Sequence, residues 1–408
     1  MNILGTIANA IRRLSLTSAD VSVEAGRTGD AGETVTENSA MSLSAVWACV
    51  NLLSGTISSL PLMVYRRGKD GARTVAADHP LYRLLHDRPN YDQTALDFWD
   101  FMCGSIELWG NAYARIERSG SRITALVPIH PDCMTVRRLA SGTLEYRWSA
   151  NGKSFVETDK TVLHIRGPGG NPLGGMSTLD FGRHTFSLAR AAEKTVGTTF
   201  QNGLRPSGVL KFDKFLTPDQ RQIARDEIAA KVGADRSGRP LILEGGSEWQ
   251  QLTINPKDAQ MLESRGYSVE EICRYFGVPP FMIGHTEKST SWGTGIEQQT
   301  LGFQKFTLRR RLKRIEQALA QQALTPAEIA DGLSFEFNME GLLRADSAGR
   351  AAYYLTMTNM GAMTINEVRT LESLPPVEGG DVPRMQMQNV PITQNAGIGH
   401  NGGPPLNP

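Results

Sequence analysis

The order of helices and strands in the middle of the chain restricts its possible folds more than any short motif does. Two long amphipathic helices are predicted at residues 178–202 and 256–276. The segment between them has strand, helix and strand patterns, with Thr217 as a good helix N-cap and Pro218 at the first helical position. Two long helices around a small α/β insert form an unusual arrangement, which few folds accommodate.

Residues 41–166 carry a different pattern, with helices first and hairpins afterwards. The first helix has apolar residues at alternating spacings of three and four, and Pro61 ends it. A second helix begins at Thr94, with Asp97 as its capping-box partner, and runs to Gly110. Short strands joined by Ser-Gly and Asn-Gly turns follow. Helices followed by hairpins predict an α+β fold.

Composition places the chain among globular proteins and argues against a free-standing nucleic-acid binder. The 43 basic and 42 acidic residues give a net charge of +1, so no overall basic field is expected. No apolar run is long enough to cross a bilayer, which predicts a cytoplasmic protein without a membrane partner. Residues 1–40 and 375–408 offer little to bury, and we expect a flexible N-terminal arm and a disordered tail.

Cysteines and histidines indicate neither a metal site nor a catalytic site. The four cysteines form no CxxC pair and lie in apolar contexts, so we expect buried, reduced thiols at Cys49, Cys103, Cys133 and Cys273. The seven histidines are scattered, without an HExxH motif or a Ser-His-Asp context. The sequence therefore predicts no catalytic residues, no metal and no cofactor.

A glycine-rich turn at residues 170–177 nearly matches a phosphate-binding P-loop. Gly170 and Gly175 have the required spacing, but Met176 stands where the phosphate-binding lysine belongs. Without that cation the segment is better explained as a turn before the helix at Thr178. A nucleotide-dependent packaging ATPase is therefore disfavoured, and the protein is predicted not to be an enzyme.

Residues 268–278 look like the first half of a helix-turn-helix motif. In DNA-binding proteins of that kind a recognition helix of several turns follows the turn. Here Pro279 and Pro280 are followed by only three residues before Gly284, which leaves no room for a helix that could enter a major groove. A helix-turn-helix DNA-binding regulator is kept as the alternative function.

A polar loop at residues 285–293 is followed by a helix predicted at residues 294–324. One face of that helix is apolar, and its other faces carry cations: Lys305, Arg309, Arg310, Arg311, Lys313 and Arg314. The pattern is typical of a solvated amphipathic helix. It also suits a surface near a phosphate backbone or against an acidic neighbouring subunit.

Five strings in this chain, in this order, resemble one family, the portal (head-to-tail connector) proteins of tailed bacteriophages. The strings are AVWACV at 45–50, HPLYRLL at 79–85, LWGNAY at 108–113, NGLRPSGVL at 202–210 and FGVPP at 276–280. The resemblance covers roughly residues 41–374. It implies a ring of roughly a dozen copies at one vertex of the capsid, through which double-stranded DNA enters and leaves without sequence-specific recognition.

By position, the resemblance divides the chain into the parts of a portal subunit. These parts are a wing at 41–177, stem helices at 178–203 and 256–284, a clip at 204–255, a long wing helix and return strand at 294–340, and a crown at 341–374. The partners implied are the large terminase subunit, a head-tail adaptor and the major capsid protein. The implied location is the virion, after assembly in the host cytoplasm.

The polar loop corresponds to the tunnel loop of the family, at the narrowest part of the channel. The resemblance implies that DNA is faced by His285, Thr286, Lys288, Ser289, Thr290, Ser291 and Trp292. Because tight phosphate contacts would resist translocation, a loop of mainly Ser, Thr and Gly suits a low-friction contact. We expect Lys288 to be the main phosphate-facing charge and Trp292 to anchor the base of the loop.

Overall fold

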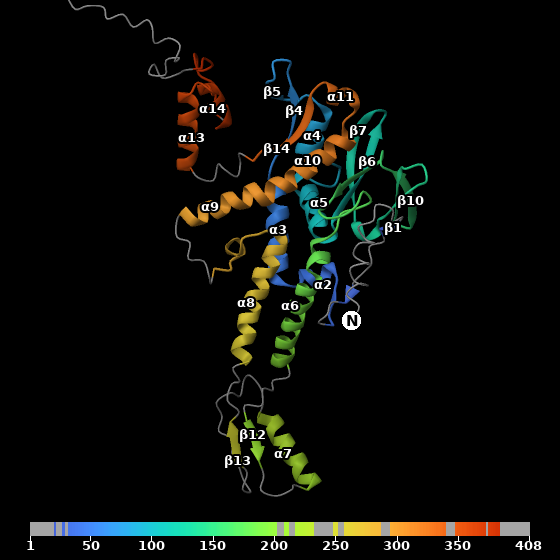
Figure 1. Cartoon of the computed structure of the whole chain (residues 1–408), viewed down its shortest axis with the longest axis vertical. Helices are drawn as coiled ribbons and strands as arrows, with labels where there is room; N and C mark the ends of the chain where they lie inside the picture. Colours follow the sequence, from blue (N-terminus) through green and yellow to red (C-terminus); the bar gives the residue numbers. More distant parts are fainter. Residues whose placement is uncertain are drawn as a thin grey trace, which may run out of the picture. The chain divides into compact units, whose positions relative to one another are not determined.

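A computed structural model gives the structure of the chain. It describes residues 20–21, 27–28, 32–201, 208–211, 217–231, 248–251, 257–286, 294–339, 347–372 and 374–383 (Figure 1). These residues fall into two units, 1–337 and 338–408.

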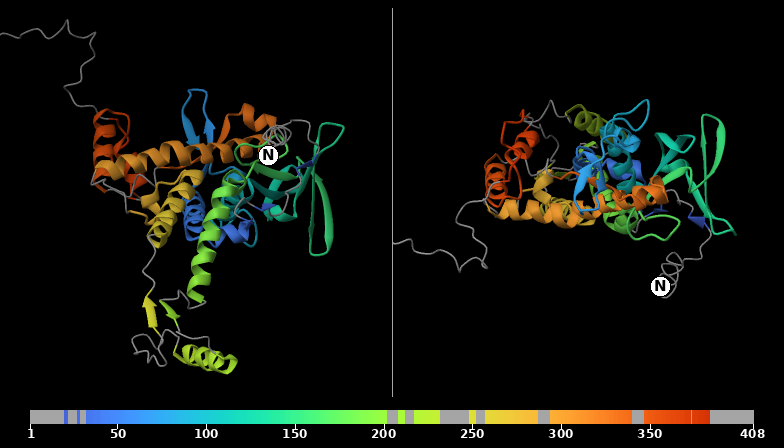
Figure 2. Two further views of the ribbon diagram at one scale, coloured as in Figure 1. Left: turned by 60° about the horizontal axis from the view of Figure 1, so that its bottom comes forward. Right: turned by 90° about the horizontal axis from the view of Figure 1, so that it is seen from above.

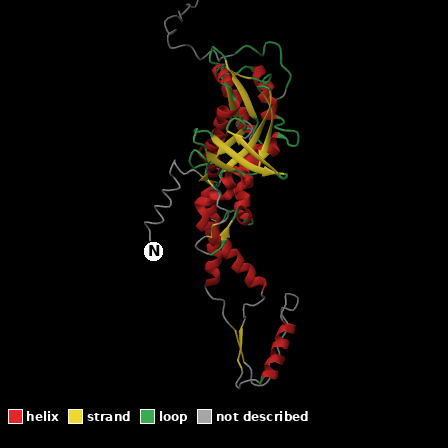
Figure 3. Ribbon diagram, turned by 90° about the vertical axis from the view of Figure 1, so that its right-hand side faces the viewer, coloured by secondary structure: helices red, strands yellow, loops and turns green. Residues whose placement is uncertain are grey.

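Three small antiparallel sheets supply most of the strands of the larger unit (Figure 3). Their strand orders are β1-β8-β9-β10, β11-β6-β7 and β14-β4-β5. The strands are β1 (Asp20–Val21), β4 (Leu62–Arg67), β5 (Arg73–Val75), β6 (Asn111–Ser119), β7 (Arg122–Ile129), β8 (Thr135–Arg138), β9 (Leu144–Ala150), β10 (Lys153–Thr158), β11 (Val162–Arg166) and β14 (Leu333–Phe337). Every pairing described is antiparallel, so the predicted mixture of helices with hairpins is confirmed.

The turns of these hairpins adopt the left-handed backbone that their sequences predicted. Gly120 (φ 63°) joins β6 to β7, and Gly142 (φ 86°) joins β8 to β9. Asn151 (φ 50°) and Gly152 (φ 73°) join β9 to β10, as expected for an Asn-Gly turn. Local chemistry therefore sets the order of these strands.

Several helices of the larger unit pack on its sheets and on one another to form the core. The helices described in this unit are α2 (Glu37–Met41), α3 (Ser44–Ser58), α4 (Pro80–His86), α5 (Ala95–Trp109), α6 (Thr178–Gln201), α7 (Pro218–Lys231), α8 (Lys257–Phe276), α9 (Thr294–Gly302), α10 (Arg309–Ala323) and α11 (Pro326–Ala330). Short 3-10 turns add Pro131–Cys133 and Pro280–Ile283. Helix α3 packs on α5 and α8, and α10 packs on β11 and β14. Phe98 and Trp99 are among the largest side chains that are fully buried there.

Helix α5 has the ends that the sequence predicts. The Thr94 hydroxyl accepts a hydrogen bond from the backbone of Asp97 (3.3 Å), and the Asp97 carboxylate accepts one from the backbone of Thr94 (3.3 Å). Gly110 ends the helix in the left-handed conformation (φ 72°).

Helices α6 and α8 lie side by side (Figure 1). In the sequence, the α/β insert lies between the C-terminal end of α6 and the N-terminal end of α8. Phe186 of α6 is fully buried, with its ring centroid 5.9 Å from that of Tyr275 and 6.3 Å from that of Phe276. In the insert, β12 (Gly208–Lys211) pairs antiparallel with β13 (Glu248–Gln251), and α7 lies between them in sequence. The predicted strand at residues 240–243 lies outside the described residues. The described elements follow one another in the order α6, β12, α7, β13 and α8.

Residues 33–42 form an N-terminal strap on α6, so the prediction of a flexible arm up to residue 40 is wrong for this segment. It contains β3 (Thr34–Val35), which pairs with β2 (Arg27–Thr28), and then α2. Lys194 of α6 donates to the Glu33 carboxylate (2.7 Å) and lowers its pKa. Arg190 of α6 donates to the backbone oxygen of Ser39. The composition of this segment did not predict the strap, because the segment has few apolar side chains. Those few, Val35 and Ala40 among them, are nevertheless well buried.

The smaller unit contains α13 (Ser347–Asn359), α14 (Ile365–Leu371) and a segment that folds back on α14. Asn366 of α14 is buried and donates to the Val377 oxygen (3.0 Å) and to the Asp381 carboxylate (2.9 Å). Its backbone N–H donates to the Gly380 oxygen (3.0 Å). The prediction that a disordered tail starts at residue 375 is therefore wrong for residues 377–381. Hydrogen bonds to the buried Asn366 hold this segment against α14.

His164 of β11 lies at the centre of a buried polar network between the sheet and α10. Its Nε2 lies 2.9 Å from Asn111 Oδ1, and its Nδ1 lies 3.2 Å from the Tyr146 hydroxyl. The Gln322 side chain of α10 accepts from the His164 N–H (2.8 Å) and donates to the His164 oxygen (3.0 Å). Burial, and then the nearby Arg166, hold the pKa of His164 well below its usual range. The imidazole is therefore neutral, with Nε2–H donating to Asn111.

This buried imidazole predicts a loss of stability in mild acid. The unfolded chain binds a proton at His164 below about pH 6.5, the usual histidine pKa, whereas the folded chain does not. We expect the free energy of unfolding to fall as the pH drops below that value, and His164→Gln to remove part of that slope. Urea unfolding at pH 7.5 and 5.5 measures it, with the more exposed His130→Gln as control. Equal slopes in wild type and His164→Gln would contradict the prediction.

Candidate functional site

The joint between α8 and α9 fixes the first end of the polar loop. Helix α8 ends at Gly277 (φ 68°), and the Val278 N–H donates to the Cys273 oxygen (3.0 Å). The 3-10 turn Pro280–Ile283 follows and ends at Gly284 (φ 83°). The His285 N–H then donates back to the Pro280 oxygen (3.1 Å). The backbone is thus held by successive hydrogen bonds up to His285.

The helix after the loop contains a π-helical segment, Phe303–Leu308, between α9 and α10, which corrects the prediction of one regular helix at 294–324. Figure 2 shows the three segments as one long run of helix. The i→i+5 hydrogen bonds of a π turn bring residues five apart onto one face, and Phe303 and Leu308 are both buried. The turn also places the Thr307 hydroxyl so that it donates to the Gly277 oxygen (2.8 Å).

Arg311 of α10 joins three helices at the base of the joint. Its Nε and Nη2 donate to the two carboxylate oxygens of Glu107 on α5 (2.6 and 3.0 Å). Nη2 also donates to the Phe276 oxygen at the end of α8 (3.0 Å). The Glu107 side chain is 7% exposed, so the pair is largely desolvated. Arg311 therefore holds the fold together and is not available as a surface cation.

The other cations predicted on this helix divide into two groups. Lys305, Arg309 and Arg310 are exposed, and among the described residues no carboxylate forms an ion pair with them. Lys313 pairs with Glu316 on the same helix (2.6 Å). Arg314 is half-buried, and burial followed by the nearby Arg310 and Arg311 lowers its pKa. The exposed basic surface is therefore smaller than the sequence predicts, and Lys305, Arg309 and Arg310 define it.

Only the first two predicted loop residues belong to the described part of the chain. Thr286 is exposed, and His285 is mostly buried with its Nε2 3.8 Å from Glu270 Oε1. Lys288, Ser289, Thr290, Ser291 and Trp292 lie outside the described residues, so their roles stay predictions. The structure brings His285 and the π-helical segment to one place, since both line the same cavity.

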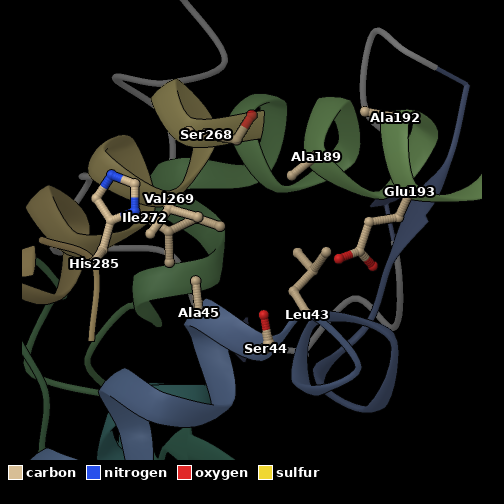
Figure 4. Close-up of a pocket in the computed structure, with 11 residues that line it drawn as sticks. Leu43, Ser44, Ala45, Ala189, Ala192, Glu193, Ser268, Val269, Ile272 and His285 are labelled. Carbon is tan, nitrogen blue, oxygen red and sulfur yellow. The ribbon is translucent and has the colours of Figure 1, made fainter. Parts of the chain in front are cut away.

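Two cavities flank the end of α8, and neither has a catalytic arrangement. A cavity of about 780 Å³ between α8 and the helix after the loop has aromatic walls from Phe281, Phe303 and Phe306. A smaller one of about 260 Å³ lies between α3, α6 and α8 (Figure 4). Glu193 and His285 lie at its opposite ends, so they form no acid–base pair.

The glycine-rich turn is a packing element and not a phosphate cradle. The Gly167 N–H donates to the Gly110 oxygen (2.6 Å), and a Cβ on Gly175 would collide with the backbone of both. These glycines are needed because three backbone segments approach closely.

The segment after the helix-turn-helix-like stretch at residues 268–278 forms only the four-residue turn Pro280–Ile283, which is too short for a recognition helix.

The described part of the chain contains no helix that combines the length and apolarity of a membrane span. Its histidine, cysteine and acidic side chains nowhere gather in a group of three that could hold a metal ion. Three of the four cysteines are buried as predicted, but Cys133 is exposed, as the last residue of the 3-10 turn Pro131–Cys133.

Comparisons with known proteins point to one family. The family described as "Phage portal protein" matches residues 44–373. The portal protein of Enterobacteria phage HK97 is 37% identical over 371 residues, which are 90% of this chain and 87% of that protein. The probable portal protein of Streptomyces phage phiC31 is 32% identical over 372 residues, covering 87% of this chain and 79% of the relative.

A solved structure shares the fold at low sequence identity. The neck of a native gene transfer agent particle, computed with C12 symmetry, contains a chain with a TM-score of 0.59 and 22% identity. The match covers 91% of this chain and 100% of that chain. At this identity the likeness concerns the fold alone.

The buried pair of Arg311 and Glu107 gives a prediction about stability. Glu107→Ala leaves a guanidinium desolvated without its partner, and we expect a loss of about 3–5 kcal/mol in the free energy of unfolding. Arg274→Ala, which breaks the more exposed pair with Glu271, should cost less than about 1 kcal/mol. Denaturant unfolding of both variants checks the difference. Similar losses in the two variants would show that Arg311 does not hold the joint.

Proposed function

The chain belongs to the phage portal protein family, and we propose that it forms the ring at one capsid vertex through which double-stranded DNA is packaged and ejected. The observation that carries the proposal is the unbroken family match over residues 44–373. That range includes the α6 and α8 hairpin with its insert, the α8 to α9 joint and the sheets that pack against them. In this function the protein acts as a structural component of the virion and catalyses no reaction.

The ring contains about twelve copies in this proposal. The C12 symmetry of the gene transfer agent neck, in which a chain of this fold occurs, supports that number. Exposed apolar side chains support contacts between copies, because a solitary subunit would leave them in water. Those on the helices of the larger unit include Trp47, Phe181, Leu188, Ile223, Tyr267, Leu301 and Phe306.

Each part of the subunit receives a role in this arrangement. The wing at 41–177 faces the major capsid protein, the stem comprises α6 and α8, and the crown is at 341–374. The clip at 204–255 extends the stem, and we propose that the large terminase subunit and later the head-tail adaptor dock there. Its support is the insert's position in the chain, between two long helices that lie side by side.

The polar loop at 285–293 is proposed to face the DNA. Its first end is held by the closed turn at Pro280–Ile283, and its second leads into α9 and the π-helical segment fixed to Gly277. The exposed Lys305, Arg309 and Arg310 add positive charge to the helix that follows. Three cations that have no carboxylate partner within the described ranges attract phosphates over a distance without specific base contacts.

The alternative of a helix-turn-helix regulator has little support. A recognition helix needs several turns, and the four residues of the turn Pro280–Ile283 do not supply them. A regulator of that kind would also act as a monomer or dimer on DNA, and not as a closed ring.

Ring formation is the first test of the proposed function. We expect the purified full-length protein to assemble into rings of about twelve copies, as the C12 neck implies. Native mass spectrometry and electron microscopy measure the copy number. A preparation that contains only monomers and dimers at micromolar concentration would overturn the proposal, as would intrinsic ATP hydrolysis in a sample free of other ATPases.

Shortening the polar loop tests its role in the channel. Replacing residues 286–291 with a shorter Gly-Ser link should leave rings intact, because the joint is held by contacts outside the loop. It should reduce the fraction of particles that retain full-length DNA. A matched Gly-Ser replacement of exposed Lys69 and Asp70, in the turn between β4 and β5, serves as the control. If the shortened protein packages and retains genomes as the control does, the loop is only a connector.

A further inference from the structure

A third cavity, of about 850 Å³, lies between the ends of the β-hairpins and the C-terminal end of α10. Its basic lining residues come from four different strands or turns: Arg118, Arg138, Lys160 and Arg166. Gln321 of α10 lines the opposite side. The cavity is separated from the joint at Arg311 by ten residues of α10, or about 15 Å. It therefore lies apart from the proposed DNA-facing loop.

The charges in this cavity are strongly unbalanced. Its lining contains four cations and one carboxylate, Asp159. Among the described residues, no carboxylate forms an ion pair with any of the four cations.

Cations nearby on the same strands are matched by acids. Arg137 and Arg147 share the carboxylate of Glu145, and Arg115 lies 3.8 Å from Glu157. These three arginines thus have acidic partners, whereas the four cations of the cavity share one carboxylate in its lining, Asp159.

Arg166 has a fixed position on the wall of this cavity. It is the last residue of β11, and its place is fixed by pairing with Asn111 of β6. An oxyanion in the cavity would supply a counter-charge for Arg166 and for the other three cations.

We propose that this cavity binds a phosphate group, either as inorganic phosphate or as a phosphodiester of nucleic acid. Arginine guanidinium groups match the oxygens of phosphate in a two-pronged geometry, and three of the four cations are arginines. A phosphate carries more charge than a single carboxylate and so balances a net lining charge of +3 better. The site needs neither the ring nor the polar loop, so it goes beyond the proposed function.

Phosphate binding to the full-length protein is the direct test. Calorimetric titration with inorganic phosphate should show binding that Arg138→Gln with Lys160→Gln weakens at least tenfold. Both residues are exposed, so the double variant should fold normally, and circular dichroism verifies this. The matched control removes two exposed cations of the β4–β5 hairpin, Arg67→Gln with Lys69→Gln, and should bind as wild type does.

A short DNA duplex distinguishes the two sources of phosphate. If the ligand is a phosphodiester, duplex binding should fall in the cavity variant and not in the control, with a smaller dependence on salt. If it is inorganic phosphate, only the phosphate titration should respond. Equal binding of both ligands by the cavity variant and the control would overturn the proposal. So would binding of polyglutamate at this site without binding of either phosphate ligand.

Discussion

The contacts of Arg311 are the interaction on which the arrangement of the larger unit depends. One planar guanidinium satisfies a nearly buried carboxylate on α5 and the last backbone oxygen of α8 at the same time. Because each of these acceptors would be costly to bury alone, the three helices can approach only in this geometry. The start of the polar loop is thereby tied to the same core that carries the β-sheets, and it cannot shift independently of them.

The sequence predicted those features whose causes are local. Thr94 and Asp97 are three residues apart, and the glycine turns act within a single hairpin, so the ends of α5 and the order of β6 to β10 could be recognised directly. The pair of Arg311 and Glu107 could not be recognised, because its members are 204 residues apart. The N-terminal strap escaped for a similar reason: Glu33 finds its partner, Lys194, only in the folded chain.

The candidate site was predicted less completely than the fold. A run of arginines and lysines does not reveal which member has a buried partner, so Arg311 was first grouped with surface cations. The sequence does contain a signal that Lys313 is paired: Lys313 and Glu316 have the i, i+3 spacing at which helical side chains form ion pairs. The polar loop was recognised by resemblance to a family, and only His285 and Thr286 of its predicted DNA-facing residues have a described position.

The π-helical segment has a consequence for how the chain tolerates changes in length. A π turn contains about one residue more than an α turn, so Phe303–Leu308 behaves as a one-residue insertion within a regular helix. Deleting one residue there would restore α geometry and leave the faces of α9 and α10 nearly in register, because the wider π turn already absorbs the extra residue. The π turn thus lets the chain carry one more residue without turning the face that α9 presents relative to α10.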